Sequence, residues 1–167
     1  MTMPDGPRYD DDFYAWTQHQ AGVLRTMQRT DNRLDREHLA EEIEDLGKSE
    51  RNAVRSQIRR IIEHLLKLAY SPSEDPRYAW MRSIAEARAS LRDEITPSLR
   101  RDVAAVLPEL YRDGRRQAAL GLQEHGEHDA AAALPEVCPY TLDHIERDEW
   151  YPKRTGSSPA APDITGA

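Results

Sequence analysis

The stretch DREHLAEEIEDLGKSERNAVRSQIRRIIEHLLKLAY, residues 35–70, predicts one long helix and decides the fold class. Its apolar residues recur at helical spacing and no proline interrupts them. Three series within it, among them Leu39 to Glu50 to Ile61, advance by 11 residues, which is the period of a nearly straight helix. At ~1.5 Å per residue, such a helix spans about 50 Å. It therefore either breaks near Gly47 or extends beyond its own bundle.

Apolar spacing and capping residues predict further helices on both sides of this segment. They cover about residues 13–30, 80–95, 97–120 with a kink or break before Pro108, and 142–148 after a Thr141 cap. We therefore expect an all-α bundle of about four main helices, with one long helix over about 36–70 and a short C-terminal helix. Residues 9–152 are predicted to form a single helical domain, between a flexible N-terminus at 1–8 and a disordered tail at 153–167.

Composition narrows the classes of function. The formal charge is -7, with 23 basic and 30 acidic residues, so binding of nucleic acid by general phosphate neutralisation is not expected. No apolar run approaches the ~18 residues that suggest a membrane span, and the N-terminus lacks the features of a signal peptide. The single cysteine allows no internal disulfide. These features predict a cytoplasmic protein without a membrane partner.

The densest group of potential ligands is His38, Glu41, Glu42, Glu44 and Asp45 on the long helix. Carboxylates three and four residues apart share one side of a helix, which is how helical bundles assemble Mg or Mn sites. The EExxD spacing also resembles one half of the motif of the all-α nucleotide pyrophosphatases, although the next predicted helix has no matching acidic pair. A metal-dependent hydrolase of phosphate esters or nucleotides, with His38, Glu41, Glu42 and Asp45 as ligands, is therefore an alternative.

The phase of the helix favours a different interpretation of these acids. At about 100° per residue, Leu39 and Leu46 lie within about 60° of the apolar position Ile61. His38, Glu42 and Asp45 lie about 100–160° away, on the flank or the back. We therefore prefer a solvated acidic face without a metal or cofactor. Its acids are expected to pair with Lys48 or with bases of a neighbouring helix, the obvious ones being Arg88, Arg112, Arg115 and Arg116.

Other reactive residues have equally ordinary interpretations. His64, at the edge of the apolar face, is expected to be a hydrogen-bonded histidine at the rim of the core. His125 and His128 could take zinc or nickel from solution, but their glycine-interrupted setting does not predict a dedicated site. Cys138 has no adjacent base that would lower its pKa and is expected to be a small buried hydrophobe. An arginine site for nucleic acid is ranked last because the chain is acidic.

Several motifs together resemble the bacterial domain-of-unknown-function 29 family over about residues 9–150. They are DFYAW at 12–16, HLAEEIEDLGKSE at 38–50, HLLKL at 64–68, PSLR at 97–100, LYRDGRR at 110–116 and CPYTL at 138–142. The resemblance implies an all-helical cytosolic domain, common in cyanobacteria and other bacteria, with no established activity.

Charge along the long helix suggests how such a domain acts. Residues 35–50 carry seven acids and two bases, whereas residues 51–70 carry five bases and one acid. An antiparallel copy would place each half opposite its complement, although the helix macrodipole favours the same order. The preferred expectation is a non-enzymatic module for self-association, as a homodimer through the long helix, or for interaction with a protein partner.

Overall fold

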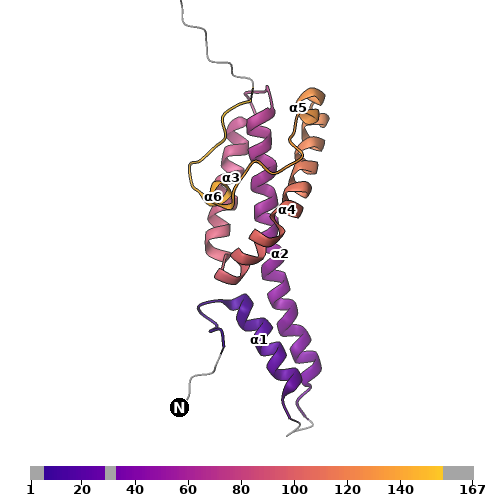
Figure 1. Ribbon diagram of the computed structural model, residues 1–167, viewed down its shortest axis with the longest axis vertical. Helices are drawn as coiled ribbons and strands as arrows, with labels where there is room; N and C mark the ends of the chain where they lie inside the picture. The colour runs from indigo at the N-terminus through magenta and orange to yellow at the C-terminus, as the bar shows by residue number, and fades with distance from the viewer. Residues whose placement is uncertain (1–5, 29–32, 156–167) are drawn as a thin grey trace, which may run out of the picture.

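The computed structural model describes residues 6–28 and 33–155, and these residues form an all-α bundle, as expected (Figure 1). Four helices are long, and α2 is the longest, as the sequence predicts. In chain order the helices are α1 (Phe13–Thr26), α2 (Arg36–Tyr70), α3 (Arg77–Glu94), α4 (Pro97–Glu124), α5 (His128–Ala132) and α6 (Leu142–Glu146).

Helix α2 is continuous and longer than the bundle around it (Figure 1). Its C-terminal half lies between α3 and α4, whereas its N-terminal half packs against α1, which makes only slight contact with α4. Of the two expected outcomes at Gly47, a break or an overlong helix, the structure has the second. We call α1 together with residues 36–50 of α2 the arm, because this pair of helices projects away from α3 and α4.

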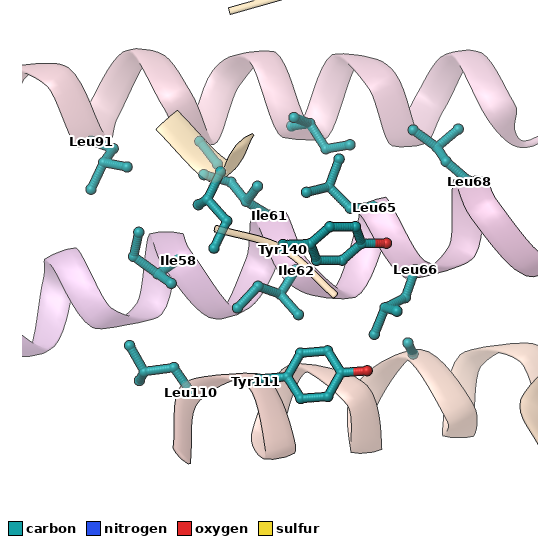
Figure 2. Close-up of a cluster of buried hydrophobic side chains, with 14 of the residues drawn as sticks. Ile58, Ile61, Ile62, Leu65, Leu66, Leu68, Leu91, Leu110, Tyr111 and Tyr140 are labelled. Atoms are coloured by element: carbon teal, nitrogen blue, oxygen red, sulfur yellow. The ribbon is translucent and has the colours of Figure 1, made fainter. Parts of the chain in front are cut away.

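The core surrounds the C-terminal half of α2 (Figure 2). Every turn of this half contributes fully buried aliphatic side chains, and α3 and α4 cover them from two sides. Tyr111 of α4 and Tyr140 of the segment before α6 close the core, and the Tyr111 hydroxyl donates to the Pro135 carbonyl at 2.6 Å. The α2 residues concerned are Val54, Ile58, Ile61, Ile62, Leu65, Leu66 and Leu68.

The arm has no equivalent of α3 or α4, so the predicted apolar stripe of α2 is covered only in part. Leu39 and Leu46, which phase places on the core-facing side, are 40 % and 56 % exposed. Their expected burial is wrong because α1 covers only the side of α2 that carries Ala40 and Gly47. The apolar stripe does continue along α2, but the described residues contain no element that buries these leucines.

The helix ends follow the capping signals in the sequence. Asp35, Thr96 and Thr141 each accept a hydrogen bond from the first turn of the helix that follows, and Pro97 occupies the first turn of α4. Helix α4 is not broken at Pro108, although its ribbon bends between its first turns and the part beside α2 (Figure 1). The expected interruption therefore takes the form of a bend.

The chain after α6 remains attached to the bundle beyond the predicted boundary at residue 152. The Thr155 amide donates to the Ala69 carbonyl at 2.7 Å, and Arg154 donates from Nε to the Ser71 carbonyl at 3.2 Å. Residues 153–155 are thus held against the C-terminal end of α2. The rest of the predicted tail, and residues 1–5 of the predicted flexible N-terminus, lie outside the described residues. No described helix is both long and apolar enough to cross a membrane.

Asp12 joins the start of α1 to the start of α4. Its carboxylate accepts from the Ala15 amide at 3.0 Å, the Ser98 amide at 2.8 Å and the Ser98 hydroxyl at 2.6 Å. Burial acts to raise the pKa of Asp12, but the hydrogen bonds from Ser98 and Ala15 outweigh it and hold this pKa below the ordinary value. The charged carboxylate therefore stabilises the fold, and protonation removes that contribution.

We expect Asp12→Ala to lower the free energy of unfolding by about 1–2 kcal/mol at neutral pH, because one cap and two links to Ser98 are lost. The folded pKa is depressed, so the contribution is complete above the ordinary pKa of about 4 and disappears as pH falls through the lowered pKa. Urea titrations of both proteins between neutral and acid pH measure the difference. Asp11→Ala, an exposed neighbour, is the matched control, and a pH-independent difference for Asp12→Ala would contradict this account.

Candidate functional site

The acidic group singled out in the sequence lies on the exposed surface of the arm. Glu44 accepts from Arg25 of α1 at 2.5 Å and lies 3.7 Å from Lys48, whose ammonium is 3.0 Å from Asp45. The Arg25 hydrogen bond holds the pKa of Glu44 below its ordinary value. The expected pairing with Lys48 and with a base on a neighbouring helix is therefore present, and that base is Arg25.

In the part of the chain that the structure describes, no second helix completes a ligand set around these acids. His38 bonds through Nδ1 to Asp35 at 2.6 Å, which raises the pKa of His38, and Glu41 and Glu42 are exposed. Within residues 6–28 and 33–155, no group of three or more His, Cys, Asp or Glu side chains is placed to hold a metal ion. Among the described residues, the Mg or Mn alternative receives no convergent acids from α1, the helix that packs beside this part of α2.

The arginines expected to face the acidic group lie elsewhere, so that pairing is wrong. Arg88 donates to the Ile145 carbonyl at 2.9 Å, and Arg115 donates to the Pro135 carbonyl at 2.9 Å. Arg116 pairs with Asp113 on its own helix, and Arg112 is exposed. The physical reason is position: α3 and α4 pack on the C-terminal half of α2, whereas the acids occupy the N-terminal half.

The remaining sequence candidates take up structural positions. His64 is partly buried and bonds through Nδ1 to the Arg60 carbonyl at 2.8 Å, as expected for a rim histidine, and burial lowers its pKa. Cys138 is half-buried, its thiol donates to the Tyr140 carbonyl at 3.3 Å, and burial raises its pKa. His128 begins the short helix α5, and no ligand group for zinc or nickel forms around it in the described chain. None of these residues forms a reactive cluster.

A cavity that the sequence did not predict lies at the C-terminal end of α2, with a volume of about 600 Å³. This is within the range of about 300–1,000 Å³ usual for small-molecule sites. Its walls come from three remote stretches: the end of α2, the loop 71–76 with the start of α3, and the end of α4 with the turn before α5. The lining residues are Lys67, Ser73, Glu74, Asp75, Pro76, Trp80, Gly121, Leu122, His125 and Glu127.

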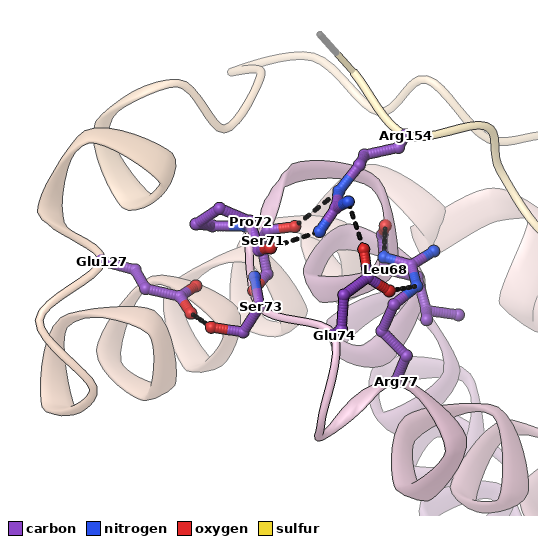
Figure 3. Close-up of polar contacts among 8 residues, drawn as sticks. All are labelled: Leu68, Ser71, Pro72, Ser73, Glu74, Arg77, Glu127 and Arg154. Carbon is purple, nitrogen blue, oxygen red and sulfur yellow. Dashed lines mark hydrogen bonds and ion pairs between the residues drawn. The ribbon is translucent and has the colours of Figure 1, made fainter. Parts of the chain in front are cut away.

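The loop beside the cavity is held from both sides (Figure 3). On one side the Ser73 hydroxyl donates to Glu127 Oε1 at 2.5 Å. On the other side Arg154 bonds to the Pro72 carbonyl and to the Glu74 carboxylate. Arg77 adds a bond from Nη1 to the Leu68 carbonyl at 2.9 Å. The cavity wall is thus a fixed part of the fold, anchored by residues from three segments.

The polar groups of the cavity are mostly hydrogen-bond acceptors. Lys67 is neutralised by Glu63 at 2.6 Å, and its side chain crosses Gly121, where an added Cβ would lie 2.6 Å from Nζ. Among the described residues Asp75 pairs with no base, and the Oε2 atom of Glu127 is buried without a hydrogen-bond partner. His125 bonds through Nδ1 to the Gly121 carbonyl at 2.8 Å, so that nitrogen carries a proton, and in the neutral ring Nε2 is left as an acceptor.

A second hollow, of about 460 Å³, lies at the base of the arm and is acidic. Tyr9 and Phe13 line it together with Glu50, Asp93 and Glu94. Burial, followed by repulsion from Glu50 and Asp93, raises the pKa of Glu94. The sequence did indicate one feature here, because the 11-residue period places Glu50 on the apolar stripe of α2.

Comparison with known proteins confirms the resemblance found in the sequence. The family model described as "Domain of unknown function DUF29" matches residues 8–151. Among solved structures, an alpha-helical protein of unknown function from Rhodospirillum rubrum is 27 % identical with a TM-score of 0.75, over 87 % of this chain and 93 % of that one. No curated protein matches. Because the family model spans most of its length, the chain belongs to the family Domain of unknown function DUF29.

Proposed function

We propose that this chain is a non-enzymatic cytoplasmic module that forms a homodimer through one side of the arm. The observation that carries the proposal is the row of large apolar side chains that the arm leaves exposed. Val23 of α1 and Met27, the C-cap residue that follows α1, are 39 % and 42 % exposed, and Leu39 and Leu46 of α2 are exposed to a similar degree. An exposed apolar group of this kind is typical of an interaction surface.

Helical phase places these four side chains on the same side of the arm. The two helices lie in close contact at Thr17 and Gly47, since a Cβ on Gly47 would be 2.1 Å from Thr17 Oγ1. We take Thr17 and Gly47 as the facing positions and count about 100° per residue around each helix axis. All four side chains then lie about 80–120° from the facing position, in the same rotational direction. Arg25 and Glu44, which pair with each other, lie about 60–80° away in the opposite sense. One side of the arm is therefore apolar and the other is charged.

A second copy of this chain is the partner that best fits this surface. Two arms joined by their apolar sides make a four-helix bundle, in which each copy covers what the other exposes. The C-terminal half of α2 already lies between α3 and α4, so the arms are the parts of the two copies that meet.

We expect the double variant Leu39→Glu, Leu46→Glu to be a monomer where the natural protein is a dimer, because charges replace the centre of the apolar side. Sedimentation at several concentrations measures the mass, and circular dichroism checks that the helices remain. The matched control is Leu120→Glu on α4, which is 50 % exposed and outside the arm. A natural protein that is monomeric at every concentration, at low and high salt, would contradict the proposal.

A further inference from the structure

The cavity at the C-terminal end of α2 lies at the opposite end of this helix from the tip of the arm, and the proposed dimer does not use it. Its walls combine an apolar part with a few polar groups, as small-molecule sites do. Trp80, Leu122 and Pro76 supply the apolar part. The polar groups of the cavity that have no partner are hydrogen-bond acceptors. A ligand that fits them must therefore supply hydrogen-bond donors.

Two charged side chains that line the cavity already have partners within the protein and are not free to bind a ligand. Lys67 is paired with Glu63, and Glu74 is paired with Arg154. Asp75 and Glu127 remain without a base in the part of the chain that the structure describes. These two carboxylates and the free Nε2 of His125 all accept hydrogen bonds.

Glu127 is the most informative of these groups. Its Oε1 accepts from Ser73, but its Oε2 is buried and meets no donor among the described residues. A buried carboxylate oxygen without a donor is costly, and a specific case in a folded protein calls for a physical explanation. A ligand ammonium group would supply both the donor and the opposite charge.

We propose that this cavity binds a small organic cation, a primary amine attached to a flat apolar body. The ammonium group donates to Glu127, with Asp75 and His125 as further acceptors, and the apolar body packs against Trp80 and Leu122. A positive charge near the Trp80 ring adds a cation–π attraction. An anionic ligand of the same shape is disfavoured, because Lys67 is already neutralised.

The test uses 2-phenylethylamine as the probe and 3-phenylpropionate as an anion with the same apolar body. The indole N–H signal of Trp80, assigned in the full chain by its loss in Trp80→Phe, reports binding in an NMR titration. The amine is expected to shift this signal saturably, and the anion is not. A titration in which the amine produces no saturable shift, or in which the anion binds as tightly, overturns the proposal.

The variant Glu127→Gln tests the carboxylate itself. Its amide oxygen can still accept from Ser73, so the loop contact is kept while the charge is lost. We expect it to bind the amine about tenfold more weakly or worse, as for the loss of a charge-assisted hydrogen bond. Glu124→Gln, an exposed carboxylate outside the cavity lining, should bind as the natural protein does. Equal affinity in Glu127→Gln and the natural protein overturns the proposal.

A second variant keeps the proposal testable if Glu127→Gln does not fold. Asp75→Asn removes the exposed carboxylate of the cavity and should weaken amine binding several-fold; unchanged binding would count against the cationic ligand. The dimer variant Leu39→Glu, Leu46→Glu should bind the amine normally. Failure of the cavity proposal is therefore distinguishable from failure of the proposed dimer.

Discussion

Replacing Gly47 with alanine is expected to loosen the arm and lower the stability of the protein by about 2 kcal/mol. A Cβ at this position would lie 2.1 Å from Thr17 Oγ1 and 2.8 Å from Gln18 Nε2. Thr17 is fully buried, and its hydroxyl donates to the Tyr14 carbonyl at 2.7 Å, so it cannot simply rotate away without losing that bond. Helix α1 must therefore move outward from α2.

The sign of this effect is informative because helix propensity predicts the opposite. In an exposed helix, Gly to Ala stabilises by about 0.5–1 kcal/mol. Gly22 of α1 supplies that control, since nothing lies within 4 Å of the Cβ position there. We expect Gly22→Ala to raise the melting temperature and Gly47→Ala to lower it by roughly 4–8 °C for a domain of this size.

A double-mutant cycle assigns the loss to the contact with Thr17. Thr17→Ala removes the hydroxyl that lies closest to the added Cβ, so the pair Thr17→Ala, Gly47→Ala should recover part of the stability lost in Gly47→Ala alone. Hydrogen exchange should also rise first in the amides of α1, because α1 depends on this crossing. Melting of Gly47→Ala at or above the natural temperature would show that α1 does not pack against α2 in this way.

The elements themselves were predictable because their signals are local. Asp35 is three residues before the His38 amide that it caps, and Thr96 precedes Pro97 in sequence as in space. Apolar phase likewise identified the buried side of α2 from Val54 onward. Such signals depend on residues within one or two turns, which a single sequence contains in full.

Contacts between helices were not predictable in the same way. The arginines of α3 and α4 are predicted to meet the acids of α2. Those two helices instead pack on the C-terminal half of α2, and Arg25 of α1 pairs with Glu44. The cavity requires residues 67, 73 and 127 to meet, and no spacing in the sequence signals this. Arg88 did give a signal, because it follows Ile84 and Ala87 on the apolar stripe of α3, and such a position predicts a buried charge with a structural task.

Replacing that buried arginine, Arg88→Ala, is expected to cost about 3 kcal/mol in the free energy of unfolding. Arg88 is 1 % exposed and holds the end of α6, with Nε on the Ile145 carbonyl at 2.9 Å and Nη2 on the His144 carbonyl at 3.0 Å. The last carbonyls of a helix have no partner within it, so the guanidinium acts as its C-terminal cap. Alanine leaves both carbonyls unpaired and opens a cavity beside Tyr151, over which the guanidinium lies at 5.5 Å.

The methionine variant separates packing from hydrogen bonding at this site. Arg88→Met keeps most of the volume but loses both bonds, and it also removes the cost of burying a charge whose Nη1 has no partner among the described residues. Its loss of unfolding free energy should therefore be smaller than that of Arg88→Ala.

The control variant is Arg92→Ala, one turn further along α3. It removes only an exposed ion pair with Asp148 and should cost less than about 1 kcal/mol. Urea unfolding gives the three values, and hydrogen exchange should rise in residues 142–146 for the Arg88 variants alone. If Arg92→Ala costs as much as Arg88→Ala, the attachment of α6 depends on surface charge and not on the buried cap.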